Sequence, residues 1–86
     1  VIIENNCFIG PAVCFTNDKY PKSGIKRDLS NTNWLVGEGS SIGANSTILP
    51  DVNIGKNCLI GAGSLVNKNI PDNSTAYGNP IKIKQK

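Results

Sequence analysis

The chain has 86 residues and a mass of 9.1 kDa, which allows one small domain. It contains no His, so a Ser-His-Asp or Cys-His nucleophile pair, a His-ligated zinc ion and an imidazole general base are excluded within this chain. The net charge is only +3, an excess that the C-terminal Lys82, Lys84 and Lys86 supply, so a nucleic-acid-binding surface has little support.

An apolar residue recurs at every sixth position in the first part of the chain, at Ile3, Ile9 and Phe15. A period of six fits neither an amphipathic helix nor an alternating flat strand. It predicts short strands separated by corners, in which three hexads close one triangular coil and coils stack about 4.8 Å apart. We therefore predict a parallel β-helix whose first coil spans residues 1–18.

The next inward residue after Phe15 is Val36, 21 positions later (36 − 15). The polar segment 19–33, which contains Pro21 and Gly24, predicts a loop extruded from one corner. Loops of this length in compact domains are usually functional.

The second predicted stretch of coils spans residues 34–70, and in it the repeat runs without a miss from Val36 to Val66. The inward aliphatic residues are Val36, Ile42, Ile48, Ile54, Ile60 and Val66. The next position is most often glycine, and four places after each aliphatic residue stands a mostly small one: Cys7, Val13, Ser40, Ser46, Val52, Cys58 and Ser64. We expect the aliphatic side chains to fill the prism, and Gly and Asn to adopt left-handed backbone conformations at the corners. The alternative, a β-sandwich, predicts turn signals every 8 to 12 residues instead.

After Ile70-Pro71 the repeat fades, and residues 71–86 form the predicted irregular C-terminal tail. Turns are expected at 72–74 and 78–80. Residues 81–84 alternate Ile and Lys, which is typical of an edge strand whose lysines discourage further pairing.

The three cysteines, Cys7, Cys14 and Cys58, are odd in number and form no CxxC motif. This disfavours a disulfide framework or a metal site and favours a reducing, cytoplasmic location. Cys7 and Cys58 fall on the inward small-residue position, and the sequence offers no base to activate Cys14, so none is predicted to be catalytic.

The hexads that begin at Ile42 and Ile60, with the later Tyr77-Gly-Asn-Pro80 segment, resemble the hexapeptide-repeat acyltransferases. The segment from Phe15 to Pro21 resembles a narrower branch, the N-acetyltransferases that act on 3-amino sugars carried on UDP or dTDP. The resemblance implies a left-handed β-helix, a homotrimer, acetyl-CoA as co-substrate without a metal, and a role in the biosynthesis of surface polysaccharide such as lipopolysaccharide.

The same resemblance implies a place for acetyl-CoA in the groove between neighbouring subunits. The backbone N–H groups of Ala44 and Ala62 would approach the pantetheine and the thioester. Lys68 and Asn79 would lie toward the adenine and phosphate end, with Lys82 as a further phosphate ligand. The alternative is that the alanines are small only because the turns are tight, and that Lys68 is a solvated surface residue.

Asn17 is the predicted catalytic residue. Its uncharged carboxamide suits the positioning of an acceptor amine that loses its own proton as it attacks. Thr16, Asp18 and Tyr20 are predicted to help bind the sugar, and basic loop residues are predicted to meet the nucleotide pyrophosphate: Lys22, Lys26 and Arg27. The alternatives are an Asx-turn at Asn17 and loop charges that are only solvated.

Members of this family normally carry further coils, and sometimes a His, before a segment like this one. We therefore expect the chain to be the C-terminal part of a longer enzyme. Two other functions remain open at this point: a non-catalytic β-helical trimerisation module, and an acyltransferase domain with a different acceptor. A carbonic anhydrase on the same fold needs three His on zinc, and this chain has none.

Overall fold

The computed structural model describes residues 1–16 and 34–85, and within these ranges every regular element is a β-strand. The strands of the first coil are β1 (Ile2–Ile3), β2 (Phe8–Ile9) and β3 (Cys14–Phe15). Those of the second are β4 (Leu35–Val36), β5 (Ser41–Ile42) and β6 (Thr47–Ile48). The third coil holds β7 (Asn53–Ile54), β8 (Leu59–Ile60) and β9 (Leu65–Val66), and two longer strands follow, β10 (Ser74–Tyr77) and β11 (Lys82–Gln85).

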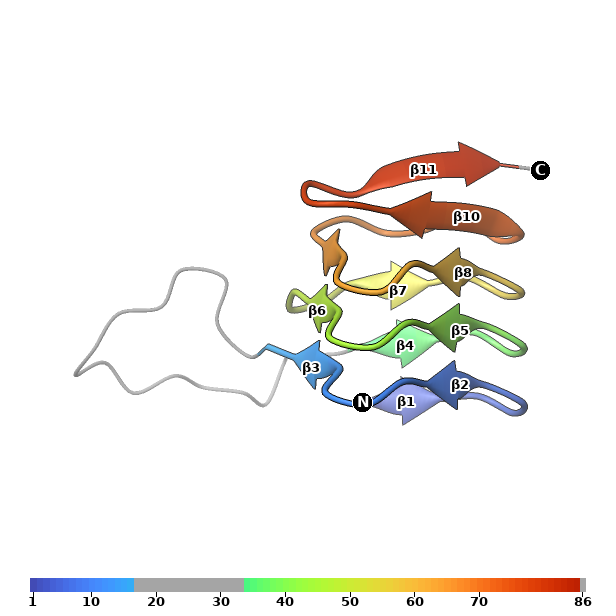
Figure 1. Cartoon of the computed structure of the whole chain (residues 1–86). Helices are drawn as coiled ribbons and strands as arrows, with labels where there is room; N and C mark the ends of the chain where they lie inside the picture. The colour runs from blue at the N-terminus through green and yellow to red at the C-terminus, as the bar shows by residue number, and fades with distance from the viewer. Residues whose placement is uncertain (17–33, 86) are drawn as a thin grey trace.

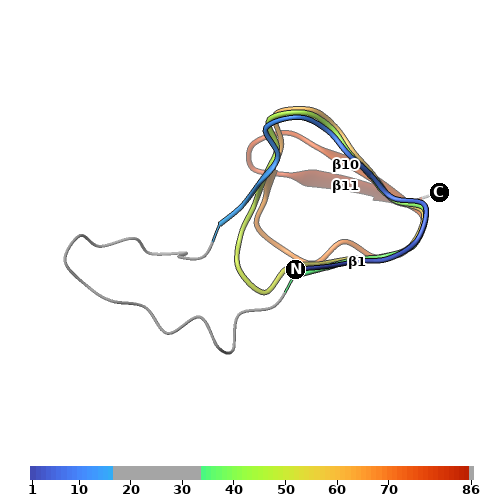
Figure 2. The ribbon, with the colours of Figure 1, turned by 90° about the horizontal axis from the view of Figure 1, so that it is seen from below.

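The coils stack in register and form a prism with three faces (Figures 1 and 2). Face A is the sheet β1-β4-β7, face B is the sheet β11-β10-β8-β5-β2, and face C is the sheet β3-β6-β9. All pairs are parallel except β10 with β11. Viewed from the first coil, the chain runs counter-clockwise as it recedes (Figure 2), so the β-helix is left-handed, as predicted.

The predicted core is confirmed. The inward aliphatic residue of each strand in the second and third coils is at most 1% exposed: Val36, Ile42, Ile48, Ile54, Ile60 and Val66. Ile3 occupies the same position in the first coil but is 46% exposed, because β1 ends its sheet and no described strand pairs below it. Stacked β-branched side chains thus fill the prism except at its lower end.

The corners depend on residues with positive φ, located three places after an inward residue: Asn6, Ala12, Gly39, Asn45, Asp51, Asn57, Gly63 and Asn73. The expectation is confirmed for the asparagines but wrong for the glycine that directly follows each inward aliphatic. Those glycines have no positive φ and are required by the close stacking of coils. A Cβ on Gly43, for example, would lie 2.5 Å from the backbone nitrogen of Ala62.

The small inward residues at the corner between faces A and B link one coil to the next. The thiol of Cys7 donates to the carbonyl of Gly37 at 3.2 Å, and the Cys58 thiol donates to the carbonyl of Pro71 at 3.1 Å. Between them, Ser40 Oγ donates to the Gly55 carbonyl at 2.6 Å. The thiols of Cys7 and Cys58 are therefore structural, as the sequence predicts.

The upper end differs from the predicted tail. Ile70 pairs in parallel with Ile54, so it takes the next inward position of face A although it comes only four residues after Val66. The spacing of six then continues to Ala76, which pairs with Ile60. One further hexad thus lies beyond residue 70. The chain then turns over residues 78–81, and β11 closes face B as its antiparallel edge strand (Figure 1).

Candidate functional site

The predicted thioester-binding residues lie at the corner between faces B and C, here called the B–C corner. After the inward Ile42 and Ile60, the chain turns through residues 43–45 and 61–63. The N–H of Gly63 donates to the carbonyl of Ala44 at 2.8 Å, which places one turn directly on the other. Ala44 is half-buried and Ala62 is exposed.

Within the described residues, no acceptor pairs with the backbone N–H of Ala44 or of Ala62. The equivalent N–H groups at the corner between faces A and B belong to Glu38 and Lys56, and both are capped. Glu4 Oε1 accepts from Glu38 at 3.1 Å, and Asp72 Oδ1 accepts from Lys56 at 2.8 Å. The B–C corner therefore presents two donors, one above the other, on residues whose own side chains are methyl groups.

A glycine lies below each of these amides. A Cβ added to Gly10 would stand 2.7 Å from the Ala44 nitrogen, and one added to Gly43 would stand 2.5 Å from the Ala62 nitrogen. Both positions must lack a side chain if the coils are to stack at this spacing. The result is a strip of small residues parallel to the helix axis.

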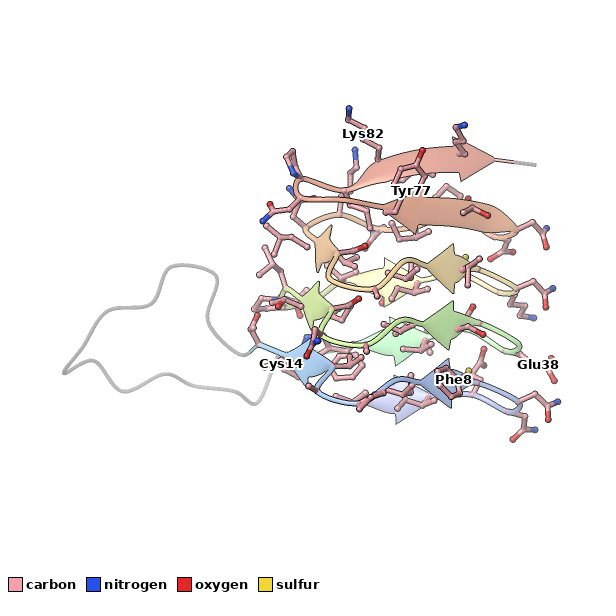
Figure 3. The ribbon with its side chains drawn as sticks, in the orientation of Figure 1. Phe8, Cys14, Glu38, Tyr77 and Lys82 are labelled. Carbon is pink, nitrogen blue, oxygen red and sulfur yellow. The ribbon has the colours of Figure 1, made fainter. Side chains whose placement is uncertain are left out.

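The strip ends above at Tyr77 and Gly78. The N–H of Gly78 donates to Ser64 Oγ at 3.2 Å, and the N–H of Leu65 donates to the Gly78 carbonyl at 3.0 Å. Asn79 follows in the exposed turn, and Lys82 opens β11 directly opposite Tyr77 (Figure 3). Of the five predicted cofactor residues, Ala44, Ala62, Asn79 and Lys82 thus gather at this corner.

Lys68 lies elsewhere. It is an exposed residue between β9 and Ile70, at the corner between faces C and A, so the whole width of face C separates it from the B–C corner. The structure therefore does not group Lys68 with Asn79 and Lys82 on a single chain.

Only Thr16 among the predicted acceptor residues is described. It follows β3, its N–H donates to the Ile48 carbonyl at 2.8 Å, and its hydroxyl donates to the same carbonyl at 3.2 Å. The side chain is thus anchored to the second coil. The remaining predicted residues lie outside the described residues: Asn17, Asp18, Tyr20, Lys22, Lys26 and Arg27.

Charge is unevenly distributed over the described surface. Three of its four carboxylates, those of Glu4, Glu38 and Asp72, line the corner between faces A and B, and Asp51 lies at the corner between faces C and A. The B–C corner carries no carboxylate. Lys82 is exposed beside this corner, and Lys84 is exposed farther along β11. This corner is therefore suited to a ligand with phosphate groups.

The described residues contain no group of three side chains able to hold a metal ion. Within residues 1–16 and 34–85, no helix has the length and apolar character needed to cross a membrane.

Two family models match the chain. The bacterial transferase hexapeptide (six repeats) matches residues 35–68, and the hexapeptide repeat of succinyl-transferase matches residues 1–14. The chain is therefore built from hexapeptide repeats of the kind that these two models describe. The matched residues are those of the three coils, so the repeat that builds the prism is also the repeat that defines the family.

Relatives of this hexapeptide-repeat chain include acetyltransferases with different acceptors. It is 39% identical over its whole length to 43% of a galactoside O-acetyltransferase of Lactococcus lactis subsp. lactis. Over 58% of its length it is 52% identical to 26% of the dTDP-3-amino-3,6-dideoxy-alpha-D-galactopyranose 3-N-acetyltransferase of Aneurinibacillus thermoaerophilus.

Among solved structures, the chain is similar to a variant of the perosamine N-acetyltransferase of Caulobacter crescentus in complex with CoA and GDP-perosamine. The TM-score is 0.71 at 30% identity, over 93% of this chain and 31% of that one. The chain spans less than half the length of these relatives.

Proposed function

We propose that this chain forms the acetyl-CoA-binding part of an N-acetyltransferase that acts on a 3-amino sugar linked to UDP or dTDP. The observation that carries the proposal is the pair of uncapped backbone N–H groups of Ala44 and Ala62 at the B–C corner. Carbonyl oxygens of the pantetheine and the thioester are acceptors that such amides bind. Lys82 and Asn79 at the upper end of the same strip suit the phosphate groups of the cofactor.

The chemistry needs little beyond positioning and charge stabilisation. The acceptor amine attacks the thioester carbon, the C–N bond forms, and the carbonyl oxygen becomes an oxyanion that backbone N–H donors stabilise. The C–S bond then breaks, and the proton lost by the amine is taken up by the departing CoA thiolate. Asn17 holds the amine without competing for its proton, while Thr16, Asp18, Tyr20 and Lys22 bind the sugar nucleotide.

The groove needs a second wall. No pocket forms among the described residues, and the amides of Ala44 and Ala62 lie at a corner of the prism. We therefore assign the second wall to another copy of the chain in a homotrimer. Lys68, at the far edge of face C, would reach the cofactor only from such a neighbour. The cytoplasm, where acetyl-CoA and sugar nucleotides are both available, is the proposed location.

A hydroxyl acceptor is the second candidate, because the O-acetyltransferase relative matches the whole chain. A hydroxyl is a weak nucleophile that normally requires a general base. A neutral amine is the stronger nucleophile, and it can attack the thioester before it loses its proton. The amine is therefore the better-supported acceptor.

The test is an acetyl-transfer assay with the full-length protein, acetyl-CoA and matched sugar nucleotides that bear either an amine or a hydroxyl at C3. We expect free thiol to appear only with the amine. Release with the hydroxyl sugar alone would establish O-acetylation, and no release with any acceptor would contradict the proposal.

An Asn17→Ala variant separates catalysis from scaffolding. We expect kcat to fall about 100-fold, as is typical when a positioning group is lost. Asn31→Ala, a matched change within the predicted loop 19–33, should leave kcat unchanged. Unaltered turnover in Asn17→Ala would instead favour a scaffold role for this segment.

A further inference from the structure

We propose that the phenol ring of Tyr77 is the platform on which the adenine of acetyl-CoA stacks, with the ammonium group of Lys82 beside it for the phosphates. This inference rests on the proposed function, because it assigns the nucleotide end of the same cofactor. It gives a role to an aromatic residue that the predicted site did not include.

Tyr77 interrupts a regular column. It directly follows the inward Ala76, and in the three coils below it the residue at this position is a glycine: Gly10, Gly43 and Gly61. A Cβ added to Gly61 would stand 3.0 Å from the Cβ of Tyr77, so the tyrosine sits directly above the last glycine. The strip of small residues therefore ends against an aromatic side chain.

The ring is exposed on a rigid strand. Along β10, Ser74 and Ala76 are buried, so Thr75 and Tyr77 point to the outer surface of face B, and Tyr77 is 46% exposed. Its strand is paired on both sides, with β8 and with β11, and the next residue is held by the hydrogen bonds of Gly78. A ring carried on such a strand can stack on a base without any ordering of the backbone.

The surroundings of Tyr77 match a nucleotide. Lys82 lies directly opposite it in the antiparallel register and on the same outer surface, as Figure 3 shows, and Lys84 lies opposite Thr75. No described carboxylate lies on face B. An exposed ring beside two ammonium groups complements a base that carries phosphates.

The other exposed apolar side chains of face B lack this pairing. Phe8 lies opposite Ser41, and Leu59 lies between Ser41 and Thr75. Neither has a cation opposite it in register. The combination of an aromatic ring and an ammonium group therefore distinguishes the upper end of the strip from the rest of this face.

Calorimetric titration of the full-length protein with CoA and with phosphopantetheine, which lacks the adenosine and two of the three phosphate groups, tests the assignment. Base stacking on an aromatic side chain contributes about 1–3 kcal/mol, so Tyr77→Ala should weaken CoA binding about 5- to 150-fold. Tyr77→Phe, which keeps the ring, should remain within about twofold of the wild type, and phosphopantetheine should bind all variants equally.

Tyr77→Leu repeats the test with a side chain that suits a strand but has no aromatic face, should the alanine variant fold poorly. Unchanged CoA affinity in Tyr77→Leu, or equal weakening of CoA and phosphopantetheine, would overturn the inference while leaving the proposed cofactor intact. A wild type that binds phosphopantetheine and CoA equally well would also overturn it. A wild type that binds neither compound would overturn the proposed function itself.

Discussion

The carboxylate of Asp72 accepts a hydrogen bond from the backbone N–H of Lys56 at 2.8 Å, and so caps the corner of the coil below. The amide of Ala62 holds the same place at the next corner of that coil and has no such cap among the described residues. The two corners are built from successive hexads of the same pattern, so the difference lies in the side chains that the neighbouring coils supply. Carboxylates occupy the amides of one corner, whereas the amides of the other corner stay open to a ligand.

Asp72→Ala should therefore lower stability without affecting cofactor binding. Loss of one hydrogen bond, here an exposed one, costs about 0.5–1.5 kcal/mol. Asp72→Asn retains the acceptor oxygen and should stay close to the wild type. Thermal unfolding measures the first effect and CoA titration the second; a large loss of CoA affinity in Asp72→Ala would show that the two corners are not independent.

Ser40 and Ser74 occupy equivalent buried positions and should respond oppositely to truncation. Ser40 Oγ donates to the Gly55 carbonyl at 2.6 Å and accepts from the Cys58 N–H at 3.0 Å, whereas Ser74 Oγ is buried without a partner. Ser40→Ala should cost about 1–3 kcal/mol because it leaves buried groups unpaired. Ser74→Ala should be neutral or stabilising in the same unfolding assay. A destabilised Ser74→Ala variant would contradict this account of the buried serines at the corner between faces A and B.

Gly43 and Gly63 are also predicted to respond differently to substitution. A Cβ on Gly43 would overlap the Ala62 nitrogen at 2.5 Å, so Gly43→Ala should destabilise the coil by about 1–3 kcal/mol. Gly63 has a φ of +71° and no atom within 4 Å of a built Cβ. Asn occupies the same corner position at Asn45, with a φ of 62°. Gly63→Asn should therefore leave the unfolding temperature almost unchanged, and a marked fall would contradict the proposed division of roles.

The period of six was sufficient to predict the prism, because each inward aliphatic is fixed by a constraint repeated in every coil. It was not sufficient at the upper end, where the corner between Val66 and Ile70 is two residues shorter than the repeat. In the sequence the shortened corner appears only as a break in the repeat, because Ile70 comes four residues after Val66 and the position six after Val66 is Asp72. Only the pairing of Ile70 with Ile54 reveals that the hexads continue to Ala76.

The site was predictable where a residue's position in the hexad sets its environment. Ala44 and Ala62 lie at equivalent positions of their hexads, so the resemblance to the hexapeptide-repeat acyltransferases was enough to assign them to one site. Whether an amide is capped depends on side chains a full coil away, such as Asp72, and no local pattern reports this. Tyr77 was missed for a related reason: its place above Gly61 follows from the shift after Val66. Lys68 lies near Asn79 in the sequence but across face C in the fold.

The central claim is that the open amides of the B–C corner bind acetyl-CoA, and Ala62→Pro tests it most directly. Proline removes the N–H, and Pro11 already occupies the equivalent position in the first coil, so the backbone tolerates it there. Ala62→Gly, which keeps the N–H, is the control. The measurement is the Kd for CoA by calorimetry. We predict a rise of about 3- to 10-fold in Ala62→Pro with little change in Ala62→Gly. Equal Kd values for Ala62→Pro and the wild type would contradict the account.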